Sequence, residues 1–254
     1  MKSWIELKNV SINIPIYGAD KTFRGALVDR CVGGNLKNTN NIISVQALDN
    51  INLKLNSGDR LGLIGHNGAG KSTLLSVLAG VYKPLQGIVS FRGKITPLFN
   101  LAPGMDPVDT GLENIMTIGM FLGMTKKEIL QKTESIVEFT ELAEFIHLPV
   151  RTYSAGMIAR LTFGIATSLE PDILLIDEGI GAGDHSFANK AKKRLEDFYN
   201  NINIIVVASH SSELIKQLCN KAILLEHGKI VASGTVDEIF EIYSPEVNSI
   251  EQFI

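Results

Sequence analysis

The run from Gly65 to Ser72 reads Gly-His-Asn-Gly-Ala-Gly-Lys-Ser and fits the pattern G-x-x-x-x-G-K-[ST]. Its glycines let the backbone take positive φ, so successive N–H groups turn inward and bind an anion at the start of a helix. In such a loop Lys71 reaches the β- and γ-phosphates of a nucleotide, and the Ser72 hydroxyl ligates Mg²⁺. The run therefore predicts a nucleotide-binding site.

The segments on either side of this run give it the structural setting that a phosphate loop needs. Residues 60–64, Arg-Leu-Gly-Leu-Ile, have the pattern of a short buried strand. Residues 72–79 have the pattern of an apolar helix that Gly80 closes. The alternative is a glycine-rich turn that matches the pattern by accident, and the order strand, loop, helix argues against it.

Two adjacent carboxylates follow another apolar strand, in the run Ile173-Leu-Leu-Ile-Asp-Glu178. Ligands of open α/β sheets bind at the carboxyl ends of the strands. Asp177 suits the holding of Mg²⁺ opposite Ser72, directly or through water. Glu178 suits a general base that accepts the proton of the attacking water. Apolar strands also end in Asp or Glu without a catalytic role, so the assignment depends on the phosphate loop.

His210 follows the next apolar run, Ile204-Ile-Val-Val-Ala-Ser209. A histidine there is a structural residue near a helix start at Ser211, or it donates a hydrogen bond to the γ-phosphate of a bound nucleotide. The sequence alone leaves both alternatives open.

Length and charge limit the possible partners. The chain has 254 residues and a formal net charge of −3, so it has no overall basic field of the kind that marks nucleic-acid binding. No segment approaches the ~18 apolar residues of a transmembrane helix, and the first residues do not resemble a signal peptide. Cys31 and Cys219 have neither metal-binding nor disulfide spacing. We expect a soluble, cytosolic protein that binds no nucleic acid.

The apolar runs predict an α/β fold with a mainly parallel sheet, since continuous rather than alternating apolar strands are typical of strands covered on both faces. An antiparallel β portion is expected at the N-terminus, with strands at 4–10 and 51–55. Helices are expected at 125–140, where Thr125 and Glu128 form a capping box, at 155–169, at 186–199 and at 235–243. We expect one domain over 1–254, with an α/β core at 1–109 and 171–254, a helical subdomain at 110–170 and an insertion at 18–44.

The order of these features, together with the run Tyr153-Ser-Ala-Gly-Met157, resembles the nucleotide-binding subunits of ATP-binding-cassette (ABC) transporters. The run is similar to the family signature L-S-G-G-Q and keeps its serine and second glycine. Helix capping alone would also explain Ser154. The resemblance implies a P-loop ATPase of the ABC type that binds ATP and Mg²⁺ and hydrolyses ATP.

In that family two domains pair head to tail, and each ATP lies between the phosphate loop of one and the signature of the other. The resemblance therefore implies a homodimer in which Ser154 and Gly156 of the partner subunit complete each site. Tyr17 resembles the aromatic residue that stacks on adenine, although a tyrosine at a strand end is the alternative. The residues expected to bind ATP within one chain are Tyr17, Gly65, His66, Asn67, Gly68, Ala69, Gly70, Lys71, Ser72 and Thr73.

One departure from the family pattern concerns a glutamine that usually precedes the motif seen here as Thr110-Gly-Leu-Glu-Asn114. No Gln occurs between Gln86 and Gln131, and Asn100 is the nearest amide.

A second resemblance is narrower. Several segments are similar to ATPases that drive bacterial polysaccharide export, especially of O-antigen chains. These segments are residues 98–105 and 113–115, the run Ile176-Asp-Glu-Gly-Ile-Gly-Ala-Gly-Asp184 and the signature variant.

This second resemblance implies that the chain works with integral-membrane permease subunits, and we expect two of them. It also implies that the cargo is a lipid-linked polysaccharide. It places the protein on the cytoplasmic side of the bacterial inner membrane. Some members of the group carry a further C-terminal carbohydrate-binding domain. Because this sequence ends at Ile254, soon after the last expected helix, we expect the form without that domain.

Two other functions stay open. A teichoic acid, a capsule polymer or a small solute is an alternative cargo, and a soluble ABC ATPase of DNA repair or translation is an alternative class. Met116, Met120 and Met124 occur at helical spacing. They are either core residues or the lining of a groove that receives a helix of the permease.

Overall fold

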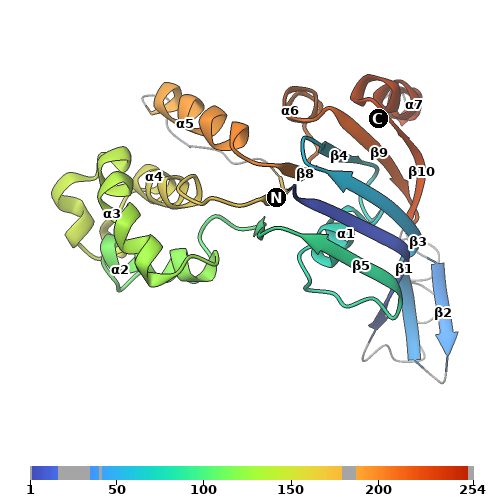
Figure 1. Cartoon of the computed structure of the whole chain (residues 1–254), viewed down its shortest axis with the longest axis horizontal. Coiled ribbons are helices and arrows are strands. Elements are labelled where there is room, and N and C mark those ends of the chain that lie inside the picture. Colours follow the sequence, from blue (N-terminus) through green and yellow to red (C-terminus); the bar gives the residue numbers. More distant parts are fainter. Residues whose placement is uncertain (1, 17–34, 40–41, 179–186, 251–254) are drawn as a thin grey trace. The chain divides into compact units, whose positions relative to one another are not determined.

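The computed structural model describes residues 2–16, 35–39, 42–178 and 187–250, which form two sheets and seven helices within those ranges (Figure 1). The larger sheet contains β4 (Arg60–Ile64), β6 (Ile95–Leu98), β7 (Ile173–Asp177), β8 (Ile204–Ala208), β9 (Lys221–Glu226) and β10 (Lys229–Gly234). The smaller sheet contains β1 (Trp4–Ile16), β2 (Asn35–Thr39), β3 (Ile42–Asn56) and β5 (Gln86–Arg92).

The larger sheet has the strand order β10-β9-β4-β8-β7-β6. Strand β4 lies parallel to both β8 and β9, whereas β9 and β10 form an antiparallel pair. Every residue of β8 is buried, as the continuous apolar run predicted. The expected α/β fold with a mainly parallel sheet is confirmed.

The smaller sheet has the order β2-β3-β1-β5 and is antiparallel throughout. Trp4 of β1 lies opposite Asn56 of β3 on one side and Arg92 of β5 on the other. The predicted antiparallel β portion at the N-terminus is therefore confirmed. Strands β2 and the start of β3 fall within the expected insertion at 18–44, while residues 18–34 lie outside the described residues.

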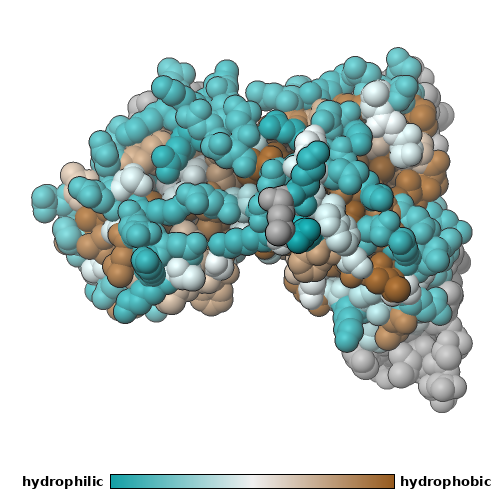
Figure 2. Space-filling view, viewed as in Figure 1, coloured by the Kyte–Doolittle hydropathy of each residue, from teal (hydrophilic) through white to brown (hydrophobic). Residues whose placement is uncertain are grey.

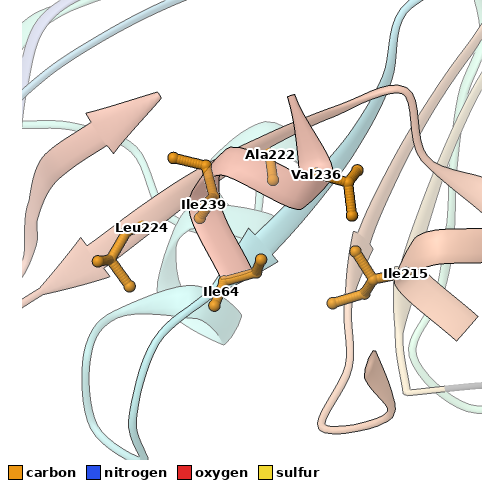
Figure 3. Close-up of a cluster of buried hydrophobic side chains, with 6 residues drawn as sticks. All are labelled: Ile64, Ile215, Ala222, Leu224, Val236 and Ile239. Atoms are coloured by element: carbon orange, nitrogen blue, oxygen red, sulfur yellow. The ribbon is translucent and has the colours of Figure 1, made fainter. Parts of the chain in front are cut away.

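The chain divides into two compact units. The first comprises Met1–Ile95, Leu175–Glu178 and Asn203–Ile254, with helices α1 (Lys71–Leu78), α6 (Ser212–Leu218) and α7 (Val236–Ile250). Figure 3 shows one part of its core, where side chains from β4, β9, α6 and α7 meet. These side chains are Ile64, Ile215, Ala222, Leu224, Val236 and Ile239.

The second unit comprises Thr96–Leu174 and Gly179–Ile202. Its helices are α2 (Gly111–Phe121), α3 (Lys126–Thr140), α4 (Ala155–Ala166) and α5 (Ala188–Asn200), with short 3₁₀ turns at Ala143–His147 and Val150–Thr152. Both α2 and α3 begin with a complete capping box, at Thr110 and at Thr125, so the helix start predicted at Thr125 is confirmed.

The helical unit is larger than the segment 110–170 expected from the sequence. It takes in α5, whose Ala191 shares a buried cluster with Phe139 of α3 and Phe163 of α4. The ring of Phe187, the residue before α5, lies 5.0 Å from the ring of Phe139 and 6.3 Å from that of Phe163. Within the described part of the chain, no helix is both long and apolar enough to cross a membrane.

Candidate functional site

The predicted phosphate loop lies between β4 and α1 and has the backbone that its glycines allow. Gly65, Gly68 and Gly70 have φ of 151°, 81° and 110°, a region that L side chains rarely adopt. A Cβ at Gly70 would lie 2.9 Å from Ala47 O. The loop thus needs glycine at this position for space as well as for conformation.

Lys71, the first residue of α1, folds back over the loop. Its Nζ donates to Gly65 O at 2.6 Å and to His66 O at 3.1 Å. Burial lowers the pKa of the Lys71 ammonium, and the negative charge of Asp177 opposes that shift. A buried ammonium held by two carbonyl oxygens of a glycine-rich loop at the start of a helix is an arrangement suited to a phosphate chain.

The two carboxylates lie at the end of β7, next to β8 in the sheet. Glu178 N donates to Ala208 O at 2.8 Å, which ties the end of one strand to the end of the other. Glu178 has φ of 70°, a left-handed conformation that is uncommon for a residue with a side chain. Asp177 is half-buried and Glu178 is exposed.

His210 follows β8 and is exposed, one residue before Ser211, which caps α6 through a bond from Leu214 N to its Oγ at 3.2 Å. Strands β4, β8 and β7 are consecutive neighbours in the sheet. The loop after β4, His210 after β8 and the Asp177–Glu178 pair at the end of β7 therefore follow three neighbouring strands, and Glu178 N bonds to Ala208 O at the end of β8. Their roles stay predictions.

The turn between β9 and β10 contacts the phosphate loop, and sequence reasoning missed it. Gly228 N donates to Ala69 O at 3.0 Å, and Gly228 O accepts from Asp49 N at 2.8 Å. The ring of His227 lies 5.3 Å from the ring of His66. The dipeptide His-Gly between two short strands signals a turn, but nothing local indicates what that turn touches.

The signature variant lies in the helical unit and begins α4. Ser154 Oγ accepts from Met157 N at 3.2 Å, so the capping role is present. Tyr153 is buried, and its hydroxyl donates to Phe145 O at 2.6 Å, which fixes the residue before the cap. A Cβ at Gly156 would meet only Ser154 Oγ, at 3.9 Å. Packing within the chain therefore does not explain why this position is glycine.

Two residues singled out in the sequence, Tyr17 and Asn100, are not placed at this site by the structure. Tyr17 lies outside the described residues. Asn100, the nearest amide to the missing glutamine, accepts the N–H of Ala102 at 2.9 Å in a local turn.

The residues present fit ATP and Mg²⁺. The loop has positive-φ glycines where a Cβ would collide, and its lysine is already drawn inside. Ser72 and Asp177 supply hard oxygen ligands, which Mg²⁺ prefers. In the described ranges no three His, Cys, Asp or Glu side chains gather to hold a metal by themselves.

Comparison with known proteins gives one matching family and several relatives. The family model described as ABC transporter matches residues 48–181. An O-antigen export system ATP-binding protein of Yersinia enterocolitica, RfbE, is 48% identical over 225 residues, which are 88% of this chain and 94% of the relative. A teichoic acids export ATP-binding protein of Lactococcus lactis, TagH, is 38% identical over 212 residues, 84% of this chain but only 45% of the relative.

A solved dimer of an ATP-binding cassette bound to ADP and Pi has the same fold. Its TM-score is 0.62 at 22% sequence identity, and the match covers 91% of this chain and 98% of that one. At this level of identity the likeness supports the fold alone. The expectation of an ABC-type P-loop fold is confirmed.

Proposed function

The chain belongs to the ABC transporter family of ATP-binding proteins, and from this premise we propose that it is the ATPase subunit of an O-antigen or related polysaccharide exporter. The observation that carries the proposal is the 48% identity to an O-antigen export ATP-binding protein over 88% of the chain. The cargo is a lipid-linked polysaccharide that crosses the bacterial inner membrane, and the subunit works on the cytoplasmic side.

Each predicted residue has a distinct task in ATP hydrolysis. The N–H groups of residues 65–73 and the Lys71 ammonium would hold the phosphates, and Ser72 and Asp177 would hold Mg²⁺, which would supply positive charge next to the phosphate oxygens. Glu178 accepts the proton of the attacking water, because it stands at the same sheet edge as the loop, and His210 donates to the γ-phosphate.

We propose further that two copies of the chain close on two ATP molecules. Each chain has one phosphate loop and one signature, so it supplies half of each of two sites. Ser154 is exposed, and the space above Gly156 is open, which leaves the start of α4 accessible to a phosphate held by another copy. Ser154 and Gly156 of the partner subunit would complete the site in this way.

The methionines at helical spacing do not share one environment. Met124 is 6% exposed and belongs to the core, whereas Met120 is 52% exposed. The adjacent Phe121 is also exposed, with its ring over Gly104. Exposed apolar residues next to one another mark interaction surfaces. We propose that Met120 and Phe121 contact a helix of the permease.

Met120→Glu should block assembly with the permease while nucleotide binding stays normal, because it places a charge in an apolar contact without disturbing the core. We expect co-purification with the permease to fall by about 10-fold or more. Leu130→Glu is the matched control, since Leu130 of α3 is 60% exposed in the same unit. Equal loss in both variants would mean that Met120 has no special part in docking.

The function is tested in cells that lack this subunit but carry its genomic neighbours. Without the subunit, we expect surface O-antigen to disappear and lipid-linked polymer to accumulate inside, and the wild-type gene should restore the surface polymer. Immunostaining of intact cells measures the surface O-antigen, and gel analysis of the polysaccharide extracted from whole cells measures the polymer that stays inside. Unchanged surface polymer in the deletion strain would contradict the proposal. The 38% identity to a teichoic acids export protein keeps teichoic acid as the second candidate cargo.

A further inference from the structure

Residues 81–94, which we call the 81–94 segment, carry exposed apolar side chains unusually close together. The segment joins the end of α1 to β5 and continues two residues past it. Leu85 is 81%, Ile88 63% and Phe91 52% exposed, and Val81 and Tyr82 are exposed too. Figure 2 shows hydrophobic surface over the area where Figure 1 draws β5. Clusters of this kind mark binding surfaces, whereas single exposed apolar residues are ordinary.

The charges of the segment have one sign. It contains Lys83, Arg92 and Lys94, and no Asp or Glu occurs from Arg60 to Met105. On the neighbouring strand, Lys8 of β1 lies opposite Ile88, and its ammonium is paired with Glu6 of the same strand. Glu6 of β1 is paired with Lys8 at 3.0 Å and with Lys54 at 3.9 Å, so its charge is compensated locally. The surface therefore complements an anionic partner.

The segment presents an edge and not a groove. Among the described residues β5 is the end strand of its sheet, paired only with β1. Side chains alternate between the two faces of a strand, so Ile88 and Phe91 point to opposite sides of β5, and both are exposed. The exposed edge therefore has apolar side chains on both faces and cations between them. Such an edge fits a broad surface that it can enter to a shallow depth better than it fits a pocket on another protein.

We propose that the 81–94 segment lies in the headgroup region of an anionic membrane. Its apolar side chains would enter the boundary of the acyl chains, while Lys83 and Arg92 would pair with lipid phosphates. The chain would thus contact the bilayer directly, in addition to any contact through a permease. This inference does not depend on the exported cargo, since no permease or polysaccharide takes part in the contact.

The test is sedimentation of the full-length protein with vesicles of phosphatidylglycerol and phosphatidylcholine, compared with vesicles of phosphatidylcholine alone. We expect binding to the anionic vesicles only, weakened by added salt. Lys83→Gln combined with Arg92→Gln should reduce the partition coefficient about 20-fold. Leu85→Ser combined with Ile88→Ser should reduce it about 10-fold.

Matched controls separate the segment from general surface effects. Lys127→Gln combined with Lys192→Gln removes two exposed lysines elsewhere, and Leu130→Ser combined with Val231→Ser removes two exposed apolar side chains elsewhere. All variants should bind and hydrolyse ATP like the wild type, because none of these residues belongs to the phosphate site. Both control variants should bind vesicles like the wild type.

Several results would overturn the proposal. These are equal binding to neutral and anionic vesicles, absence of binding to both, or unchanged binding of the two segment variants. If the Leu85→Ser, Ile88→Ser variant bound vesicles normally but failed to co-purify with the permease, the segment would be a permease contact and the lipid assignment would be wrong. Failure of the vesicle assay would leave the export proposal untouched, since that is tested by surface polymer in cells.

Discussion

Glu178→Gln should abolish steady-state ATP hydrolysis and leave ATP binding intact. Glutamine keeps the size of the side chain but does not accept a proton from the attacking water, and loss of a general base slows turnover by about 10²–10⁴-fold. In the proposed dimer, hydrolysis reopens the paired subunits, so the variant should also accumulate as an ATP-bound dimer. Phosphate release measures the first effect, and size-exclusion chromatography with ATP measures the second.

The control for this variant is Glu196→Gln, which removes an exposed carboxylate on α5. It should hydrolyse ATP at the wild-type rate and stay in the wild-type oligomeric state. Normal turnover by Glu178→Gln would remove Glu178 as the base. A monomer that binds ATP but does not turn over would keep the base and reject the proposed pairing.

Lys71→Ala should weaken ATP binding by about 10² or more, because it removes charge-assisted hydrogen bonds to the phosphates that are individually worth about 1.5–3 kcal/mol. The side chain is buried in the loop, where its Nζ is held by Gly65 O and His66 O. Titration with a fluorescent ATP analogue measures the dissociation constant.

Folding must be checked separately for this variant, since the same ammonium also donates hydrogen bonds to Gly65 O and His66 O within the loop. A melting curve without ATP reports that contribution. Lys192→Ala, which removes an exposed lysine, is the control and should bind ATP normally. An unchanged dissociation constant for Lys71→Ala would contradict the role of the loop.

Local patterns were enough to predict the elements that hold the site. Residues 204–208 form a buried strand because an uninterrupted apolar run suits a strand covered on both faces. Thr125 and Glu128 begin α3 through bonds between neighbours in sequence. The phosphate loop and the Asp177–Glu178 pair are also local, which is why their spacing was informative.

Other elements depend on contacts between distant parts of the chain. Strand β5 was not predicted, since its sequence includes Gly87 at φ of 86° and its pairing is with β1, near the start of the chain. The contact of Gly228 with Ala69 has no signal in either segment. The extent of the helical unit depends on aromatic packing between α3, α4 and α5, and periodicity within each helix does not reveal it.

The left-handed backbone at Glu178 has a consequence for protein engineering. A side chain in that conformation costs on the order of 1 kcal/mol relative to glycine, and asparagine tolerates it better than most residues. A library screened only for thermal resistance would therefore enrich Gly or Asn at position 178, and each enriched clone would lose the carboxylate. Screens of this protein for robustness should include turnover as a selection criterion, because a general base at Glu178, as proposed, sets activity against heat tolerance at this residue.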